Sequence, residues 1–157
     1  MTDTTERALT TQIYQVLIKA SAEQIWDAIT RPEFTCRYFH GARVDTTGET
    51  GTPMRYYAPD GVTLWGDETI IEADRPHKLV VPWRSLYDEE MAAEPRSRVT
   101  WLIEEQDNGV CLLTATHDQL ENSPRTASSV SGIGWLTVIN GLKTLLETGE
   151  SLFPTAP

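Results

Sequence analysis

The chain has 157 residues, the size of one domain, and 39% hydrophobic and 23% charged residues are ordinary values for a globular protein. Its net charge of −10, from 13 basic and 23 acidic side chains, excludes the basic surface that binding to nucleic acid or an anionic membrane requires. No apolar run approaches the ~20 residues that cross a bilayer, and the first residues lack the pattern of a secretory signal.

The first part of the chain predicts one strand followed by two short helices. Residues 12–19 are rich in β-branched and aromatic side chains and alternate in polarity, which indicates a strand. Ser21 and Gln24 have the spacing of a capping box, so a helix is expected at residues 22–30. A proline suited to a first helical turn then opens a second helix at residues 32–39.

The middle of the chain reads as strands separated by turns that contain Gly, Pro, Asp or Asn. The predicted strands are residues 42–46, 52–57, 63–72, 78–84, 98–104 and 110–117. The segment 85–95 is acidic and has few apolar side chains, so it is expected to be a mobile loop at the mouth of any cavity. Residues 122–129 are expected to be a linker to the last element.

The last element is a long amphipathic helix at about residues 131–149. Trp135, Ile139, Leu142 and Leu146 fall on one line at helical spacing, and this stripe must be buried. The preceding strands offer the only large surface for it. A sheet that grips one helix follows, and the space between them is either filled as core or left partly open as a ligand cavity.

The element order predicts an α+β fold: a curved antiparallel sheet of about six or seven strands around a long C-terminal helix, with two short helices after the first strand. The expected organisation is a single domain at residues 12–150 between an N-terminal tail, residues 1–11, and a C-terminal tail, residues 151–157. The two cysteines, Cys36 and Cys111, lack a metal-type or CxxC spacing. We interpret them as reduced thiols, which favours a cytoplasmic protein over a disulfide-bonded one.

Several segments resemble one family. Residues 18–34 (IKASAEQIWDAITRPEF) are similar to the opening of the START-like (Bet v 1-like, SRPBCC) superfamily, and most similar to relatives of the C-terminal domain of the activator of Hsp90 ATPase. Residues 63–79, the paired segments 99–105 and 109–117, and Gly134-Trp135 followed by Leu142 agree with it. The resemblance covers roughly residues 12–150 and implies a helix-grip fold. It implies no single function, because the superfamily includes carriers, receptors, cyclases and chaperone regulators.

The inward-facing aromatic side chains carry the functional prediction. Large flat side chains suit the wall of an apolar pocket, although they also suit simple core filling. The candidate ligand-binding residues are Trp26, Phe34, Tyr38, Phe39, Tyr56, Trp83, Trp101, His117, Trp135 and Ile139.

Polar candidates are fewer. His117 ends an inward alternation and could orient a ligand or act as a base; the alternative is a strand-end histidine bonded to backbone. His40 and His77 are expected at the surface, and the three histidines lack metal-binding spacing, so neither a metal nor a cofactor is predicted. Arg37, Arg55 and Arg84 could bind an acidic headgroup if one points inward, but a surface role is the simpler interpretation. Asp67 and Glu68 are expected on the strand surface.

Three functions remain open. The first is a carrier or sensor that binds a small hydrophobic molecule without catalysis. The alternative is a chaperone-regulating protein-interaction module, as the family resemblance implies. The second alternative is a cyclase- or hydrolase-like enzyme that uses His117, although no complete catalytic motif is present. The expected partners are a small hydrophobic molecule, or a chaperone or other protein, and the expected state is a monomer or homodimer.

Overall fold

The structure is a computed structural model, and it describes residues 10–153. The tails predicted at residues 1–11 and 151–157 fall mostly outside these described residues. Within residues 10–153, no helix is long and apolar enough to cross a membrane.

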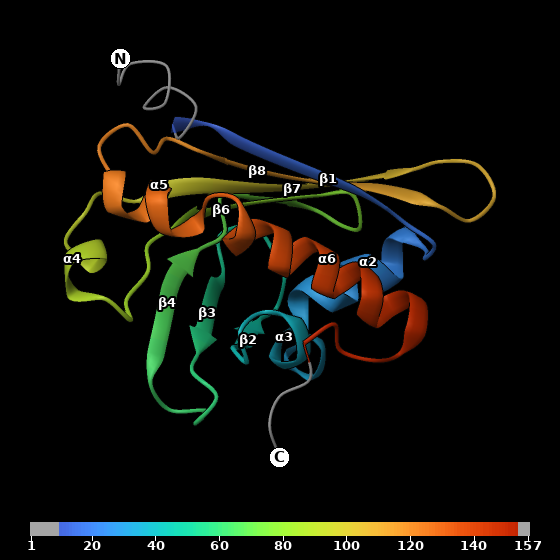
Figure 1. The fold of residues 1–157 in the computed structure, drawn as a ribbon, viewed down its shortest axis with the longest axis horizontal. Coiled ribbons are helices and arrows are strands. Elements are labelled where there is room, and N and C mark those ends of the chain that lie inside the picture. The colour runs from blue at the N-terminus through green and yellow to red at the C-terminus, as the bar shows by residue number, and fades with distance from the viewer. Residues whose placement is uncertain (1–9, 154–157) are drawn as a thin grey trace.

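The fold is α+β, as predicted, and Figure 1 shows its elements. The strands are β1 (Gln12–Ile18), β2 (Arg43–Thr46), β3 (Pro53–Tyr57), β4 (Leu64–Thr69), β5 (Glu72–Asp74), β6 (Lys78–Trp83), β7 (Ser97–Glu105) and β8 (Cys111–Asp118). The helices are α2 (Ala22–Thr30), α3 (Pro32–Tyr38), α4 (Glu89–Ala92), α5 (Pro124–Val130) and α6 (Ile133–Thr148).

The strands form two antiparallel sheets where the sequence indicated one. A five-stranded sheet has the order β1-β8-β7-β6-β5, and a three-stranded sheet has the order β2-β3-β4. The strand predicted at residues 63–72 divides between them because its partner changes. The Ile70 N–H donates to Thr52 beside β3, whereas the Ile71 N–H donates to Val80 on β6. The chain thus passes from one sheet to the other within one residue.

Helix α6 packs across the large sheet, as its apolar stripe requires (Figure 1). It begins at Ile133, two residues later than expected. Its buried side chains are Trp135, Val138, Ile139, Leu142 and Leu145, and Leu146 is partly buried beside them. Gly149 ends the helix in a left-handed conformation, with φ 80°, and its N–H donates to Leu145. This confirms the prediction of a sheet around a long C-terminal helix.

The two short helices after β1 are also confirmed. The Ser21 side chain accepts from the Gln24 N–H, and the Gln24 side chain accepts from the Ser21 N–H, so the capping box of α2 is complete. The Tyr38 hydroxyl at the end of α3 donates to the Ala28 carbonyl at 2.7 Å and ties the two helices together. Both helices pack against α6 and support its C-terminal half.

Two segments predicted without regular structure contain short helices. Asp88 caps α4 by accepting from the N–H groups of Glu90 and Met91. Helix α5 replaces part of the predicted linker, and Glu94 accepts from the Arg125 and Thr126 N–H groups of its first turn, each at 2.9 Å. The sequence pattern missed α5 because its cap comes from a loop about thirty residues earlier, and because its seven residues have no long apolar stripe.

Candidate ligand-binding site

An internal cavity of about 330 Å³ lies between the two sheets and the N-terminal half of α6. Residues from the α3–β2 connection, β3, β4, β6 and the segment after it, α5 and α6 line it. The lining is Phe39, His40, Ala42, Met54, Tyr56, Trp65, Gly66, Glu68, Val81, Pro82, Trp83, Arg84, Ser85, Tyr87, Ser129, Val130, Gly134, Trp135 and Val138. Most of this wall is apolar.

Three aromatic rings make one side of the cavity. Phe39 and Tyr56 are stacked, with ring centroids 5.2 Å apart. Trp83 packs against both, at 5.9 Å from Phe39 and 5.7 Å from Tyr56. Burial raises the pKa of the Tyr56 phenol, so this ring is neutral. Such a wall offers flat contact area to an apolar or aromatic molecule.

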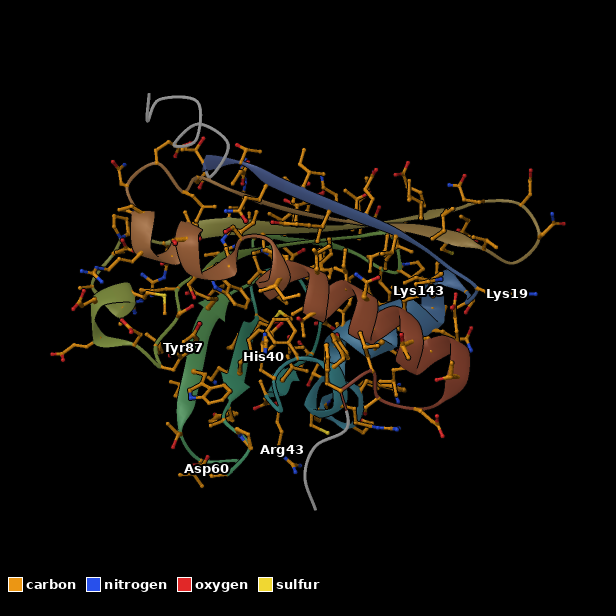
Figure 2. The ribbon with its side chains drawn as sticks, in the orientation of Figure 1. Lys19, His40, Arg43, Asp60, Tyr87 and Lys143 are labelled. Atoms are coloured by element: carbon orange, nitrogen blue, oxygen red, sulfur yellow. The ribbon has the colours of Figure 1, made fainter. Side chains whose placement is uncertain are left out.

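The cavity is open to solvent, and its exposed lining residues include Tyr87, His40 and Ser129. Tyr87 is 55% exposed and packs edge-on against Trp65, with centroids 5.8 Å apart. His40 is exposed and has a left-handed backbone conformation, with φ 55°. In Figure 2 both side chains lie on the side of α6 that faces the three-stranded sheet.

The cavity wall also has a charged part. The Glu68 side chain on β4 is only 8% exposed, and its Oε1 accepts from Arg96 Nε at 2.7 Å. Its other oxygen, Oε2, and Arg84 Nε are buried and have no hydrogen-bond partner among the described residues. Burial raises the pKa of the Glu68 carboxyl, and Arg96 and Arg84 oppose that rise.

His117 lies behind the lining, not in it. Trp135 Nε1 donates to His117 Nδ1 at 3.1 Å, and His117 Nε2 lies 2.7 Å from Ser97 Oγ. Because an indole N–H is only a donor, Nδ1 is an acceptor and the proton is on Nε2. Ser97 in turn donates to the Trp83 carbonyl at 3.3 Å. Both imidazole nitrogens therefore have partners within the protein.

Burial also lowers the pKa of His117 to about 4, although Asp118 opposes the shift. The imidazole is fully buried and neutral near pH 7. Its bonds join β8, β7 and α6 behind the aromatic wall. The arrangement differs from both sequence interpretations, since its partners are side chains and not backbone groups.

The predicted site residues divide into two groups. Phe39, Tyr56, Trp83 and Trp135 line the cavity. The others lie in the surrounding packing: Trp26, Phe34, Tyr38, Trp101, His117 and Ile139. Trp101 supports the wall from behind, edge-on to Trp135 with centroids 5.4 Å apart.

From the sequence, a surface position is expected for Glu68 and is the simpler of two interpretations for Arg84. The structure places both residues in the cavity wall. The signal for Glu68 lies in strand pairing. Glu68 is opposite buried Met54, and Gly66 is opposite buried Tyr56, so both share the inner face of β4. The β4 sequence alone does not reveal this, because glycine and glutamate lack the apolar side chains that mark a buried face. Within residues 10–153, no group of three or more His, Cys, Asp or Glu side chains could hold a metal.

Solved structures share this fold. Protein MLL2253 from Mesorhizobium loti is 19% identical with a TM-score of 0.70, covering 87% of this chain and 96% of that one. CalU16 from Micromonospora echinospora is 19% identical with a TM-score of 0.67, covering 90% of this chain and 77% of that one. The Aha1 dimer from Colwellia psychrerythraea is 15% identical with a TM-score of 0.62, covering 90% of this chain and 98% of that one. At these identities the similarity shows the fold alone.

No curated protein matches the sequence. A family match does exist, and it spans residues 19–147, from the end of β1 almost to the end of α6. It therefore covers strands β2 to β8, the cavity lining and the short helices α2 to α5. The chain belongs to the family described as Activator of Hsp90 ATPase homolog 1-like protein (AHSA1).

Proposed function

We propose that this protein binds a small, mostly apolar molecule in the cavity between the sheets and α6, and that it carries or senses the molecule without transforming it. The observation that supports this most directly is the cavity of about 330 Å³ behind an aromatic wall. Ligand pockets start at roughly 300 Å³, so the volume suits a small ligand. Phe39, Tyr56, Trp83 and Trp135 would make the apolar contacts.

The state of His117 favours binding over catalysis. A general base needs a free nitrogen within hydrogen-bond reach of the substrate. Both nitrogens of His117 are engaged, and the side chain is fully buried behind the lining. We therefore assign His117 the role of positioning Trp135, not of touching the ligand. A cytoplasmic location, expected from the thiols of Cys36 and Cys111, belongs to the same proposal.

The test is a titration with N-phenyl-1-naphthylamine, a neutral apolar probe whose emission rises on transfer from water to an apolar site. We expect saturable binding at one site per chain. Val138→Phe should weaken it about tenfold or more, because Val138 lines the cavity and a phenyl ring would occupy its volume. Leu136→Phe is the matched control, since Leu136 is 42% exposed on the same helix.

The result would contradict the proposal if the probe failed to saturate, or if both variants bound it as the wild type does. Urea unfolding of each variant separates loss of the site from loss of the fold. Native mass spectrometry of the purified protein would then give the mass of any molecule that co-purifies.

The family match favours a second candidate, a module that binds and regulates a chaperone ATPase. In that case surface residues, not the cavity, would carry the function. The measurement is the ATPase rate of purified Hsp90 with and without this protein. A change that Val138→Phe leaves intact would favour the chaperone role, whereas no change would favour the carrier. A monomer or a homodimer is compatible with either role.

A further inference from the structure

We propose that Glu68 and Arg84 form a recognition subsite for a neutral ligand group that both donates and accepts a hydrogen bond, such as a hydroxyl or a carboxamide. The inference rests on the proposed function and makes it more specific. The ligand would be amphipathic, with an apolar body against the aromatic wall and one neutral polar group at the charged part of the cavity.

The first argument is that one donor and one acceptor remain unused in the same wall. Glu68 Oε2 can accept a hydrogen bond, and Arg84 Nε can only donate one. Both atoms are buried and lack a partner among the described residues, although both side chains line the cavity. Buried polar atoms are nearly always paired, and an unpaired one is unfavourable. A ligand group that donates to Glu68 Oε2 and accepts from Arg84 Nε would supply both missing hydrogen bonds.

The second argument is that a hydrogen bond holds one oxygen of Glu68 in place while its other oxygen has no partner. Arg96 Nε binds Oε1 at 2.7 Å, and the Glu68 side chain is only 8% exposed. No ion pair joins Glu68 to Arg84 in residues 10–153, yet Arg84 is near enough to lower the pKa of the Glu68 carboxyl. Both side chains belong to the lining of one cavity and do not bond each other, so a single ligand group there could serve both.

The third argument concerns charge. A ligand carboxylate would satisfy Arg84 but would place a second anion against Glu68 Oε2. A ligand ammonium would satisfy Glu68 but would face the guanidinium of Arg84. Like charges at close range in a poorly solvated wall are strongly unfavourable. A neutral hydroxyl or carboxamide can meet both groups, so the charges select against ionised ligands.

The experiment compares four probes with one ring system: naphthalene, 2-naphthol, 2-naphthamide and 2-naphthoate. Binding is followed by the ¹⁵N–¹H shifts of the tryptophan indoles, of which Trp65, Trp83 and Trp135 line the cavity. Hydrogen bonds to charged groups are worth enough for about a tenfold or greater gain in affinity. We expect 2-naphthol and 2-naphthamide to bind about tenfold tighter than naphthalene, and 2-naphthoate to gain nothing.

The variant Arg84→Met removes the donor while keeping most of the side-chain length. It should abolish the advantage of 2-naphthol over naphthalene and leave naphthalene affinity within about twofold. Arg43→Met is the matched control, because Arg43 is exposed on β2 and does not line the cavity. If Arg84→Met does not fold, the four-probe comparison in the wild type still decides the question.

The outcomes separate the two proposals. Equal affinity for naphthalene and 2-naphthol would overturn the subsite while the carrier function stands. Tightest binding of 2-naphthoate would also overturn it, because the subsite would then be an anion site. Failure of all four probes to bind would count against the carrier function and the subsite together.

Discussion

Among single residues, His117 is a buried polar side chain with a hydrogen-bond partner at each ring nitrogen. It is fully buried, accepts from Trp135 and lies against Ser97, and burial lowers its pKa to about 4. Its charged form would lose the Trp135 bond, because a protonated Nδ1 cannot accept. The neutral imidazole therefore connects Trp135 and Ser97 by hydrogen bonds, and its protonation opposes folding.

This link predicts a specific loss of stability in acid. The unfolded pKa of a histidine is about 6.5, and the folded value is about 4. A base whose folded pKa is lowered contributes stability fully above pH 6.5 and loses it as the pH falls toward 4. Between pH 7 and pH 5 the free energy of unfolding should fall by about 2 kcal/mol through this residue alone.

The measurement is urea unfolding of the wild type and of His117→Gln at both pH values. Other groups, including His40 and Glu68, titrate in both proteins, so the difference between the two pH dependences isolates residue 117. The variant should lack the 2 kcal/mol fall. An equal fall in both proteins would show that folding does not lower the pKa of His117.

At the scale of elements, the crossing of α3 and α6 depends on a glycine in the middle of a helix. A Cβ at Gly141 would lie 3.1 Å from the Tyr38 Cβ and 3.6 Å from the Tyr38 carbonyl oxygen. Tyr38 cannot easily retreat, because it is buried and its hydroxyl is bonded to Ala28. Gly141 therefore permits the close approach that holds α3 under α6.

The prediction is that Gly141→Ala destabilises the protein although alanine is the better helix former. The helix propensity gain is about 1 kcal/mol, and overpacking a tight contact costs about 1–3 kcal/mol. We expect a net loss of about 1 kcal/mol in chemical unfolding. Asn140→Ala, one residue earlier, is the control and should change stability by no more than about 0.5 kcal/mol. A clear gain from Gly141→Ala would mean that the helices separate at little cost.

At the scale of the whole molecule, the packing is uneven. Strands β1, β8 and β7 form a continuous ladder with α6 against it (Figure 1). Ser85 and Tyr87, at the start of the segment 85–95, line the cavity. In that segment only Ser85 and Met91 are buried. It is anchored by Asp88 and Glu94 side chains instead of by a large apolar contact. Local opening of this segment should therefore require less free energy than global unfolding.

Hydrogen exchange checks this. The amides of α4 are expected to exchange through local openings, at a free energy well below that of β8, whose amides should exchange only on global unfolding. Glu94→Gln weakens the cap on α5 and should speed exchange in α4 and α5 while leaving β8 unchanged. Equal protection of the α4 and β8 amides would contradict the prediction that the segment 85–95 is mobile.

Elements with local sequence signals are predicted correctly. The Ser21 and Gln24 capping box, the Trp135 to Leu146 stripe and the Gly149 stop each depend on residues a few positions apart, and each appears in the structure as expected. The antiparallel sheet around the last helix follows from the same patterns. The start of α6 lies two residues later than predicted, because helix ends are the least determined part of a periodic pattern.

The tertiary structure decided what depends on distant partners. The division at Ile70, the cap that Glu94 places on α5, and the enclosure of His117 all join segments far apart in the chain. The cavity lining has the same origin, since Glu68 faces inward only because it pairs opposite Met54. A sequence fixes which side chains alternate along a strand, but only the partner strand decides which alternate set faces the cavity.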